Sequence, residues 1–321
     1  MKKNGILFVV GILIILGIFL YFDFFGAPQS NAEAQQFTVA VGMGRDRIEN
    51  SLVSQGFVKN QFALKIVFAL SGVQSIQPGA YKLSKAMGVW AIASALRSVP
   101  YMKWVTIPEG LRKEEIVAIL AKALGWNDTQ KQAWLAATAT PGDYFEGVYF
   151  PDTYLIPVAE SPVQTVARLQ AKFQEKFAPY AKDASHQNIK WTTALKLASV
   201  IQREAAGKSD MPLVSGILWN RLLKHMPLQV DATVQYARGD TGNGWWAPLK
   251  AGDTKIDSPY NTYLHAGLPS HPIDNPGLDA IDAALHPAST TCLYYLHDAQ
   301  GEIHCAATYA EHLRNIKEYL Q

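Results

Sequence analysis

The sequence predicts an α+β fold in which an N-terminal transmembrane helix precedes one or two small units of strands and helices and a larger mixed domain. Three observations lead to this class. An uncharged apolar run begins at residue 5, a weak internal repeat follows, and the remaining chain mixes amphipathic helical patterns with Gly/Pro-punctuated loops. The chain has 321 residues, of which 49% are hydrophobic and 17% charged, so it is long enough for two or three folded domains.

Residues 5–25 are predicted to form a transmembrane anchor. The segment from residue 5 to residue 22 carries no charge, and its last 17 residues reach the lower limit for a helix that crosses the hydrocarbon core. A secretory signal peptide has a shorter apolar core, of about 7–15 residues, so an anchor is favoured over a cleaved leader. The small residues Ala32 and Ala34 keep the cleaved leader open as the alternative.

The charges before the apolar run predict the orientation of the chain. Lys2 and Lys3 favour a cytoplasmic tail at residues 1–4, because positive flanks stay inside. A polar linker is expected at 26–36. The remaining chain is then expected on the periplasmic or extracytoplasmic side of the cell inner membrane, as a single-pass protein.

The middle of the chain repeats itself with an offset of 68 residues: Thr38-Val39 recurs as Thr106-Ile107, and Gly79-Ala80-Tyr81 as Gly147-Val148-Tyr149. Each copy has the pattern strand, helix, helix, strand. The predicted domains are a first unit at 37–100 and a domain at 101–321, which begins with a second, related unit at 104–157. This pattern resembles a LysM-like fold, which would suit glycan binding. A spacer role for at least one copy is the favoured alternative.

Composition excludes several function classes. The net charge of +2 gives no basic excess for nucleic-acid binding, and two cysteines are too few for a disulfide scaffold or a four-thiolate zinc site. The eight histidines show no His-Glu-x-x-His pattern, and the glycines at 239–244 lack the flanking strand and helix of a phosphate loop. We therefore predict no metal, no cofactor and no nucleic-acid partner.

Cys292 and Cys305 flank a pattern typical of a β-hairpin. A disulfide across this hairpin is predicted for an oxidising compartment, and two buried free thiols remain the alternative. A final amphipathic helix is expected at 310–320.

One carboxylate lies where an apolar residue is expected. Leu197, Val200, Ile201 and Glu204 share a face at helical spacing, so an acid lies on the stripe that packs inward. Burial raises the pKa of an unpaired carboxyl, and a carboxylic acid that stays protonated near neutral pH can act as a general acid. The alternative is a structural glutamate at a helix end, solvated or paired with an arginine such as Arg221.

Short polar residues gather in the segments after this helix. An asparagine lies on the apolar stripe of the next helix, and further polar residues follow in an extended stretch and in a Gly/Pro-rich loop. Such a set is more typical of a sugar-binding cleft than of a core. The candidate ligand-binding residues are Asn220, Gln229, Asp231, Tyr260, Asn261 and Thr262. Trp245 and Trp246 are candidates for stacking on sugar rings, with a core role as the commoner alternative.

In these motifs the chain resembles a known family, the membrane-anchored endolytic murein transglycosylases (YceG-like). The resemblance covers nearly the whole chain, and its motifs are specific in their order rather than singly. They are Thr-Ile-Pro-Glu-Gly (106–110), Glu-Gly-Val-Tyr-Phe-Pro-Asp-Thr-Tyr (146–154), Leu-Ala-Ser-Val-Ile-Gln-Arg-Glu (197–204), Asn-Arg-Leu (220–222), Leu-Gln-Val-Asp (228–231), Ser-Pro-Tyr-Asn-Thr-Tyr (258–263), Gly-Leu-Pro (267–269), Asn-Pro-Gly (275–277) and His-Pro-Ala (286–288). The chain departs from the family at Ala232 and Ser270-His271, which bears on subsite contacts.

The resemblance implies a mixed α/β catalytic domain that cleaves the MurNAc–GlcNAc bond of peptidoglycan and leaves 1,6-anhydroMurNAc ends. Glu204 falls on the catalytic glutamate of the family and would act as acid and then as base, while the C6 hydroxyl of the sugar attacks intramolecularly. Hydrolytic glycosidases need a second carboxylate, which the tethered hydroxyl replaces. The resemblance implies peptidoglycan glycan strands as substrate, and peptidoglycan synthases are the expected partners.

Two alternatives remain at this stage. Asp231 as a second catalytic carboxylate would make the protein a hydrolytic muramidase. A catalytically silent, glycan-binding scaffold for cell-wall synthesis is the other.

Overall fold

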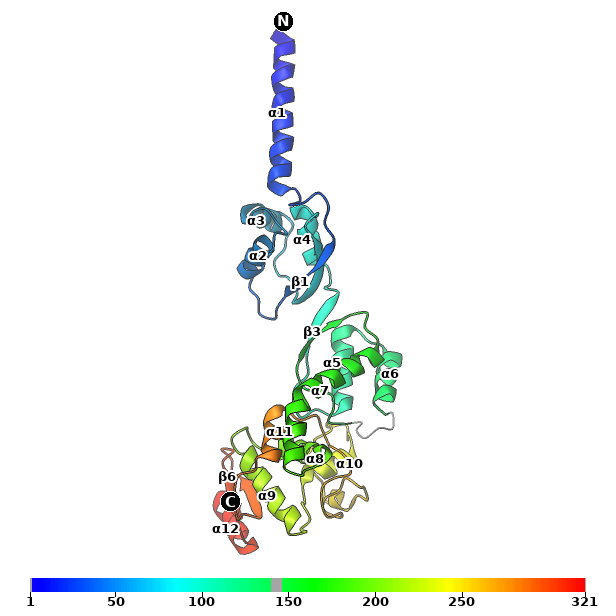
Figure 1. Ribbon diagram of the computed structural model, residues 1–321, viewed down its shortest axis with the longest axis vertical. Helices are drawn as coiled ribbons and strands as arrows, with labels where there is room; N and C mark the ends of the chain where they lie inside the picture. Colours follow the sequence, from blue (N-terminus) through cyan, green and yellow to red (C-terminus); the bar gives the residue numbers. More distant parts are fainter. Residues whose placement is uncertain (1, 140–145, 321) are drawn as a thin grey trace. The chain divides into compact units, whose positions relative to one another are not determined.

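The computed structural model describes residues 2–139 and 146–320 and divides into two compact units, which are described separately (Figure 1). Unit 1 comprises residues 1–105 and 154–160, and unit 2 comprises residues 106–153 and 161–321. Met1, the first residue of the predicted cytoplasmic tail, lies outside the described residues. The mixture of helices and short strands agrees with the predicted α+β class.

The predicted anchor is helix α1 (Lys2–Phe25). Its segment Phe8–Phe25 has a mean hydropathy of 2.6 and no buried residues, and no second helix in the described residues meets the same length and composition for a membrane span. At 1.5 Å per residue, its 24 residues extend about 36 Å, enough for the hydrocarbon core of a bilayer. The helix therefore has the properties of a membrane anchor.

Unit 1 is built on a four-stranded sheet in the order β1-β2-β3-β4. The strands are β1 (Ala34–Val39), β2 (Gly79–Ser84), β3 (Met102–Thr106) and β4 (Thr153–Pro157). Strands β1 and β2 are antiparallel, with Phe37 opposite Tyr81. Residues 34–36, predicted as the end of a linker, already belong to β1, because their backbone pairs with β2.

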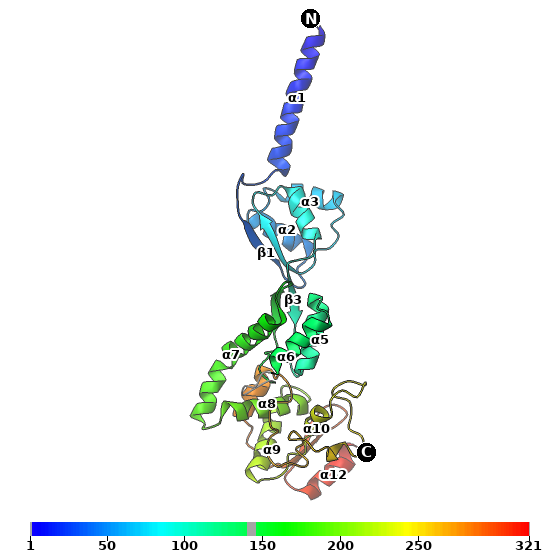
Figure 2. The same ribbon diagram turned by 90° about the vertical axis from the view of Figure 1, so that its right-hand side faces the viewer.

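Three helices share the core of unit 1 with this sheet: α2 (Arg45–Ser54), α3 (Gln61–Leu70) and α4 (Val89–Arg97) (Figure 2). Fully buried Leu52, Leu64 and Ile92, one from each helix, pack in one cluster with Phe37 and Leu83 of the sheet. Burial of each such side chain stabilises the fold by about 1.5–3 kcal/mol. Apolar residues alternate in the strands and recur at helical spacing in the helices that connect them, so each element has one apolar face for the shared core.

The second copy of the repeat has the predicted order of elements but is divided between the two units. Its strands β3 and β4 lie in the sheet of unit 1, whereas its helices α5 (Lys113–Leu124) and α6 (Asp128–Thr138) belong to unit 2. The compact units therefore differ from the expected division at residue 100. Strand pairing, which sequence periodicity does not report, decides the difference.

Unit 2 is mainly helical and centres on α8 (Trp191–Glu204) (Figure 2). Helix α8 packs against α7 (Pro162–His186), α9 (Met211–Leu223), α10 (Asp231–Arg238) and α11 (Leu278–Leu285). Leu197, Val200 and Ile201 are fully buried, as the apolar stripe predicts. A 3₁₀ turn at Asp253–Lys255 interrupts the long loop after α10.

The predicted hairpin and the predicted final helix are present in unit 2. Strands β5 (Tyr294–His297) and β6 (Ile303–Ala306) are antiparallel, and α12 (Tyr309–Tyr319) follows them. Cys292 and Cys305 form a disulfide with a Cα–Cα distance of 5.8 Å. The structure thus supports the disulfide over two free thiols.

Removing this disulfide is expected to destabilise unit 2. The bridge closes a loop with a sequence separation of 13, and a loop of this length contributes about 3 kcal/mol in the chain-entropy description. We expect the double variant C292S/C305S to lose about 3 kcal/mol of unfolding free energy in a urea titration. Reductant should lower the stability of the wild-type protein to the same level and leave the double variant unchanged; equal stability of both proteins under oxidising conditions contradicts the prediction.

Candidate active site

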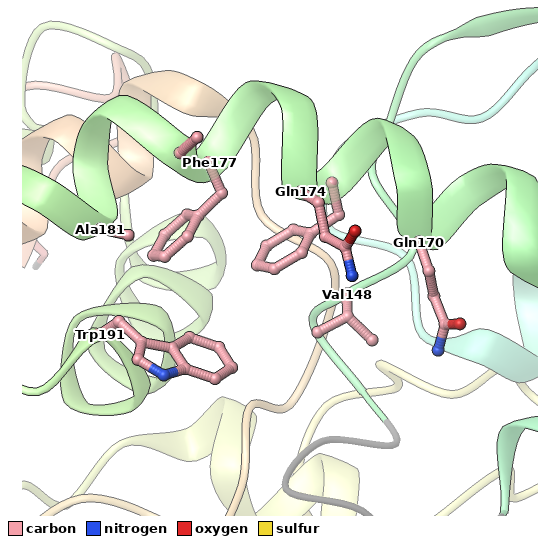
Figure 3. A pocket seen from close by; sticks show the side chains of 8 residues that line it. Val148, Gln170, Gln174, Phe177, Ala181 and Trp191 are labelled. Carbon is pink, nitrogen blue, oxygen red and sulfur yellow. The ribbon is translucent and has the colours of Figure 1, made fainter.

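Two cavities of unit 2 differ in chemistry. The first is a groove of about 430 Å³ between α7 and α8, in which Phe177 and Trp191 face one another beside Gln170 and Gln174 (Figure 3). None of its lining side chains is an acid or a base. The second, which we call the Glu204 pocket, has a volume of about 420 Å³ and is lined by Glu204, Asp231 and other polar side chains. Acid–base chemistry is therefore confined to the second of these two cavities.

Glu204 is the last residue of α8, where the backbone leaves the helix at Ala205 with ψ of 138°. The turn that follows is held by Asp210, which accepts hydrogen bonds from the backbone N–H groups of Ala206 at 2.9 Å and Gly207 at 3.0 Å. The ring of His297 in β5 bonds the same carboxylate at 2.7 Å. The end of α8 and the hairpin are thereby tied together, which fixes the backbone that carries Glu204.

The side chain of Glu204 is half-buried and accepts a hydrogen bond from the phenol of Tyr295 at 2.5 Å. Burial raises the pKa of Glu204 above its ordinary value, and the negative charge of Asp231 raises it further. The hydrogen bond from Tyr295 and the charges of His297 and Arg203 act in the opposite direction and lower the pKa. The net direction is upward, because desolvation is the largest influence.

A second carboxylate lies in the same pocket. Asp231 is the first residue of α10 and accepts a hydrogen bond from the phenol of Tyr263 at 2.6 Å. The donor orients this carboxylate, and the charge of Asp231 favours the protonated form of Glu204. The two acids therefore have different surroundings and accept from different phenols.

A cation also lines the Glu204 pocket. Arg221 of α9 is 8% exposed, donates a hydrogen bond from Nη2 to Oε1 of Gln229 at 2.8 Å, and lies 5.5 Å from the ring centre of Tyr294. Gln229 has a left-handed backbone with φ of 53°, which is rare for a residue with a side chain. The ion pair between Arg221 and Glu204 considered above is not what the structure shows; Arg221 bonds Gln229 instead.

The structure brings Glu204, Gln229 and Asp231 into one pocket, as the sequence predicts. Asn220 does not line this pocket. Its amide donates to the carbonyls of Thr290 at 2.8 Å and Cys292 at 3.1 Å, and it lines a separate cavity. Its hydrogen bonds tie α9 to the segment before the hairpin, so the predicted ligand contact is replaced by a structural one.

The loop residues Tyr260, Asn261 and Thr262 also lie outside the lining of the Glu204 pocket. Asn261 is fully buried and donates two hydrogen bonds to carbonyls of its own loop, at 3.0 and 2.8 Å. Thr262 is buried, and its backbone carbonyl and hydroxyl accept from the N–H groups of Gln229 and Val230. The ring of Tyr260 packs on another aromatic ring at 4.7 Å. Thr262 thus holds the segment before Asp231, and Asn261 holds its own loop, so neither side chain lines the Glu204 pocket.

The tryptophan pair has cationic partners outside the Glu204 pocket. The guanidinium of Arg112 lies 4.1 Å from the ring centre of Trp245, and that of Arg203 lies 4.0 Å from that of Trp246. The indole N–H of Trp246 also donates to Glu115 at 3.0 Å. Both rings therefore make cation–π contacts within the protein, and neither lines the Glu204 pocket.

Sequence reasoning missed most of the aromatic wall. The pocket is completed by residues from the loop after α10, the hairpin and α12. They are Tyr263, Tyr294, Tyr295, Tyr309 and His312. The only signal in the sequence was their density in the last part of the chain, since nothing local links the hairpin to the end of α8.

No group of three or more His, Cys, Asp or Glu in residues 2–139 and 146–320 is placed to hold a metal ion.

A glutamate with a raised pKa beside a second carboxylate in an open polar pocket is the arrangement of an acid–base enzyme. The chain belongs to the YceG-like family, which matches residues 37–318. It is 30% identical to the endolytic murein transglycosylase of Bacillus subtilis (strain 168) over 333 residues, which cover 96% of this chain and 91% of that protein.

A second relative, the endolytic murein transglycosylase of Streptococcus pneumoniae serotype 2 (strain D39 / NCTC 7466), is 26% identical over 98% of this chain and 65% of its own length. The crystal structure of a yceG-like protein from Listeria monocytogenes has the same fold. Its TM-score is 0.63 at 24% identity, covering 88% of this chain and 98% of that one.

Proposed function

We propose that this protein is an endolytic lytic transglycosylase that cleaves the MurNAc–GlcNAc bond of peptidoglycan glycan strands. Its family and the names of its relatives support the reaction class. The observation that carries the chemistry is the raised pKa of Glu204 in a polar pocket of unit 2. This carboxyl group is protonated at a pH where an ordinary glutamate is ionised, so it is available as a general acid.

Glu204 acts first as the acid. Its proton passes to the glycosidic oxygen while the anomeric carbon of MurNAc gains oxocarbenium character. The carboxylate that results then takes the proton from the C6 hydroxyl of the same sugar as that oxygen attacks the anomeric carbon. The products are a 1,6-anhydroMurNAc end and a free hydroxyl on the leaving sugar, and Glu204 is protonated again.

Asp231 and the tyrosines support this cycle. The negative charge of Asp231 favours the protonated acid before cleavage and stabilises positive charge at the anomeric carbon during it. The phenol of Tyr295 stabilises the carboxylate that Glu204 becomes after it has given its proton. The attacking hydroxyl belongs to the substrate, so its high effective concentration replaces an activated water.

Cellular placement follows from α1. We infer that this helix anchors the protein in the cell inner membrane by a single pass, with residues 1–4 cytoplasmic and both units extracytoplasmic. The disulfide agrees with an oxidising location for unit 2. Unit 1 is proposed to be a LysM-like unit that holds a glycan strand, or else a spacer, near peptidoglycan synthases that supply nascent strands.

Product analysis tests the reaction. We expect the wild-type protein to release glycan fragments whose MurNAc ends are lighter by one water than the reducing ends made by hydrolysis, as measured by mass spectrometry. Reducing ends instead would identify a muramidase that uses Glu204 with Asp231, which share the pocket. Absence of any fragment would identify a glycan-binding scaffold. Either outcome overturns the proposal.

Replacing Tyr295 by Phe is expected to shift the pH dependence of cleavage. The hydrogen bond from Tyr295 lowers the pKa of Glu204, so its removal raises that pKa further. Because activity requires the protonated acid, the alkaline limb of kcat/KM should move to higher pH, while kcat falls about tenfold through loss of one charge-assisted hydrogen bond. Tyr294→Phe, in the same strand, is the matched control and should leave the limb in place. A limb that stays fixed, or moves to lower pH, in the Tyr295 variant contradicts the assignment.

A further inference from the structure

Arg221 is a buried cation that no acid of the described chain neutralises. It is 8% exposed, its Nε is buried without a hydrogen-bond partner, and the one hydrogen bond of its guanidinium among the described residues goes to the neutral amide of Gln229. Two other arginines of unit 2 are paired with acids: buried Arg112 with Glu114 at 2.8 Å, and half-buried Arg238 with Asp253 at 2.7 Å. A buried charge without a counter-ion is costly, so its retention in a ligand pocket calls for a partner from outside the chain.

The surroundings of Arg221 are aromatic and neutral. Its guanidinium faces the ring of Tyr294, whose ring is stacked on His312 at 5.4 Å with an interplanar angle of 23°. Burial and the charge of Arg221 both lower the pKa of His312, which favours the uncharged imidazole. Among the described residues, Arg221 therefore has aromatic and neutral neighbours and no ion pair. The carboxyl groups that line the pocket are those of Glu204 and Asp231.

We propose that Arg221 is a substrate-binding residue that recognises a carboxylate carried by the glycan. This inference rests on the proposed function. A guanidinium presents parallel N–H donors that match a carboxylate, and no group of a neutral sugar ring takes this place equally well. In peptidoglycan, MurNAc differs from GlcNAc by a lactyl ether. The carboxyl group of this ether is a free carboxylate in peptide-free strands and forms an amide in strands with stem peptides. The stem peptides carry carboxylates of their own.

A carboxylate at Arg221 also explains specificity. Polymers of GlcNAc alone have the same glycosidic linkage but no anion, so they leave the guanidinium unpaired in a filled pocket. An unpaired buried group costs more than the corresponding hydrogen bond contributes, which makes this kind of discrimination strong. The site thus selects the muramyl polymer and orients the MurNAc residue relative to Glu204.

Binding to the full-length protein in detergent, with Glu204→Gln to prevent cleavage, tests the proposal. Three probes are compared by calorimetry: peptide-free strands, the same strands with their carboxylates converted to methylamides, and peptide-bearing strands. We expect amidation to weaken binding of the peptide-free strands about 10- to 100-fold, and we expect Arg221→Gln to remove the difference between the two. Arg221→Lys, which keeps the charge but not the parallel donors, should retain part of the discrimination.

The controls separate recognition from structure. Arg238→Gln removes a half-buried arginine outside the Glu204 pocket and should leave the ratio of the affinities unchanged. If the amidated strands bind the parent protein as tightly as the free acids, and peptide-bearing strands bind equally with and without Arg221, the proposal is wrong. A loss in Arg221→Gln that is equal for all three probes also contradicts it, since that is the result of a structural role.

The same series identifies the source of the carboxylate. Dependence on Arg221 for peptide-free strands alone assigns the lactyl carboxylate, and dependence for peptide-bearing strands alone assigns the stem peptide. Charge-dependent binding together with absence of cleavage by the wild-type protein would refute the proposed function while leaving the carboxylate site in place. The two proposals therefore fail on different measurements.

Discussion

Glu204→Gln is expected to lower the rate of glycan cleavage by about 10²- to 10⁴-fold, the usual contribution of a positioned general acid. Glutamine keeps the size of the side chain and can still accept the hydrogen bond from Tyr295, but it has no proton of suitable acidity to give. Release of anhydro ends from purified strands, followed over time, measures the loss. Affinity for the strands should change little, because the substitution removes the chemistry and not the pocket.

Stability provides an internal check on the same variant. Because burial raises the pKa of Glu204 in the folded protein, ionisation above the ordinary value of 4.5 opposes folding. The glutamine side chain does not ionise and so lacks this destabilising effect. The thermal midpoint of the variant at neutral pH should therefore equal or exceed that of the wild-type protein. Glu175→Gln, an exposed glutamate on α7, is the matched control and should retain full cleavage. Undiminished cleavage by Glu204→Gln refutes the assignment of the acid.

The ionisation of Glu146 is expected to contribute to a fall in the stability of unit 2 between about pH 4.5 and pH 8. Its carboxyl group is fully buried, and its pKa is raised to about 8, first by burial and then by the charge of Glu114. The side chain of Asn275 donates to it at 2.7 Å, and the backbone of Lys113 at 3.1 Å. These hydrogen bonds join the start of α5 to the loop before α11.

The direction of the pH effect follows from linkage. Below pH 4.5 the carboxyl is protonated in both states, and between 4.5 and about 8 it is ionised only in the unfolded chain, which favours unfolding as pH rises. One group shifted in this way accounts for a loss of at most about 5 kcal/mol. We expect Glu146→Gln, which keeps an acceptor for Asn275, to flatten the pH dependence and to raise the unfolding free energy at pH 8.

Denaturant titrations at several pH values measure this effect. Glu204→Gln is the control, because it removes a different acid with a raised pKa and should leave the slope from Glu146 in place. A slope that is unchanged in Glu146→Gln, or a wild-type stability that rises from pH 5 to pH 8, contradicts the prediction.

Local patterns predicted the elements that depend on neighbours in the chain. The apolar spacing before Glu204 predicted a buried helix face, and the alternation around Cys292 and Cys305 predicted the hairpin with its disulfide. The apolar run at the N-terminus predicted α1. These features depend on side-chain periodicity and turn residues, which are local signals that extend over a few neighbouring residues.

Local sequence patterns could not predict which side chains surround Glu204. Tyr295 reaches Glu204 across 91 residues and Tyr263 reaches Asp231 across 32, so each contact depends on how separate elements pack. The same packing explains why Asn261 and Thr262 support the loop instead of lining the pocket. A polar residue in a Gly/Pro-rich loop has the same pattern whether it faces a ligand or a neighbouring carbonyl.

By itself, the sequence determined that an acid lies at the end of an apolar helix face. It also determined an N-terminal helix long enough to cross a membrane and the ordered motifs of the family. Only the tertiary structure decided the direction in which the pKa of that acid moves, and only it placed the cation of Arg221 in the same pocket. A pKa depends on which charges, donors and apolar groups lie within a few ångströms, and these come from distant parts of the chain. Spacing along a helix places Glu204, whereas folding supplies its environment.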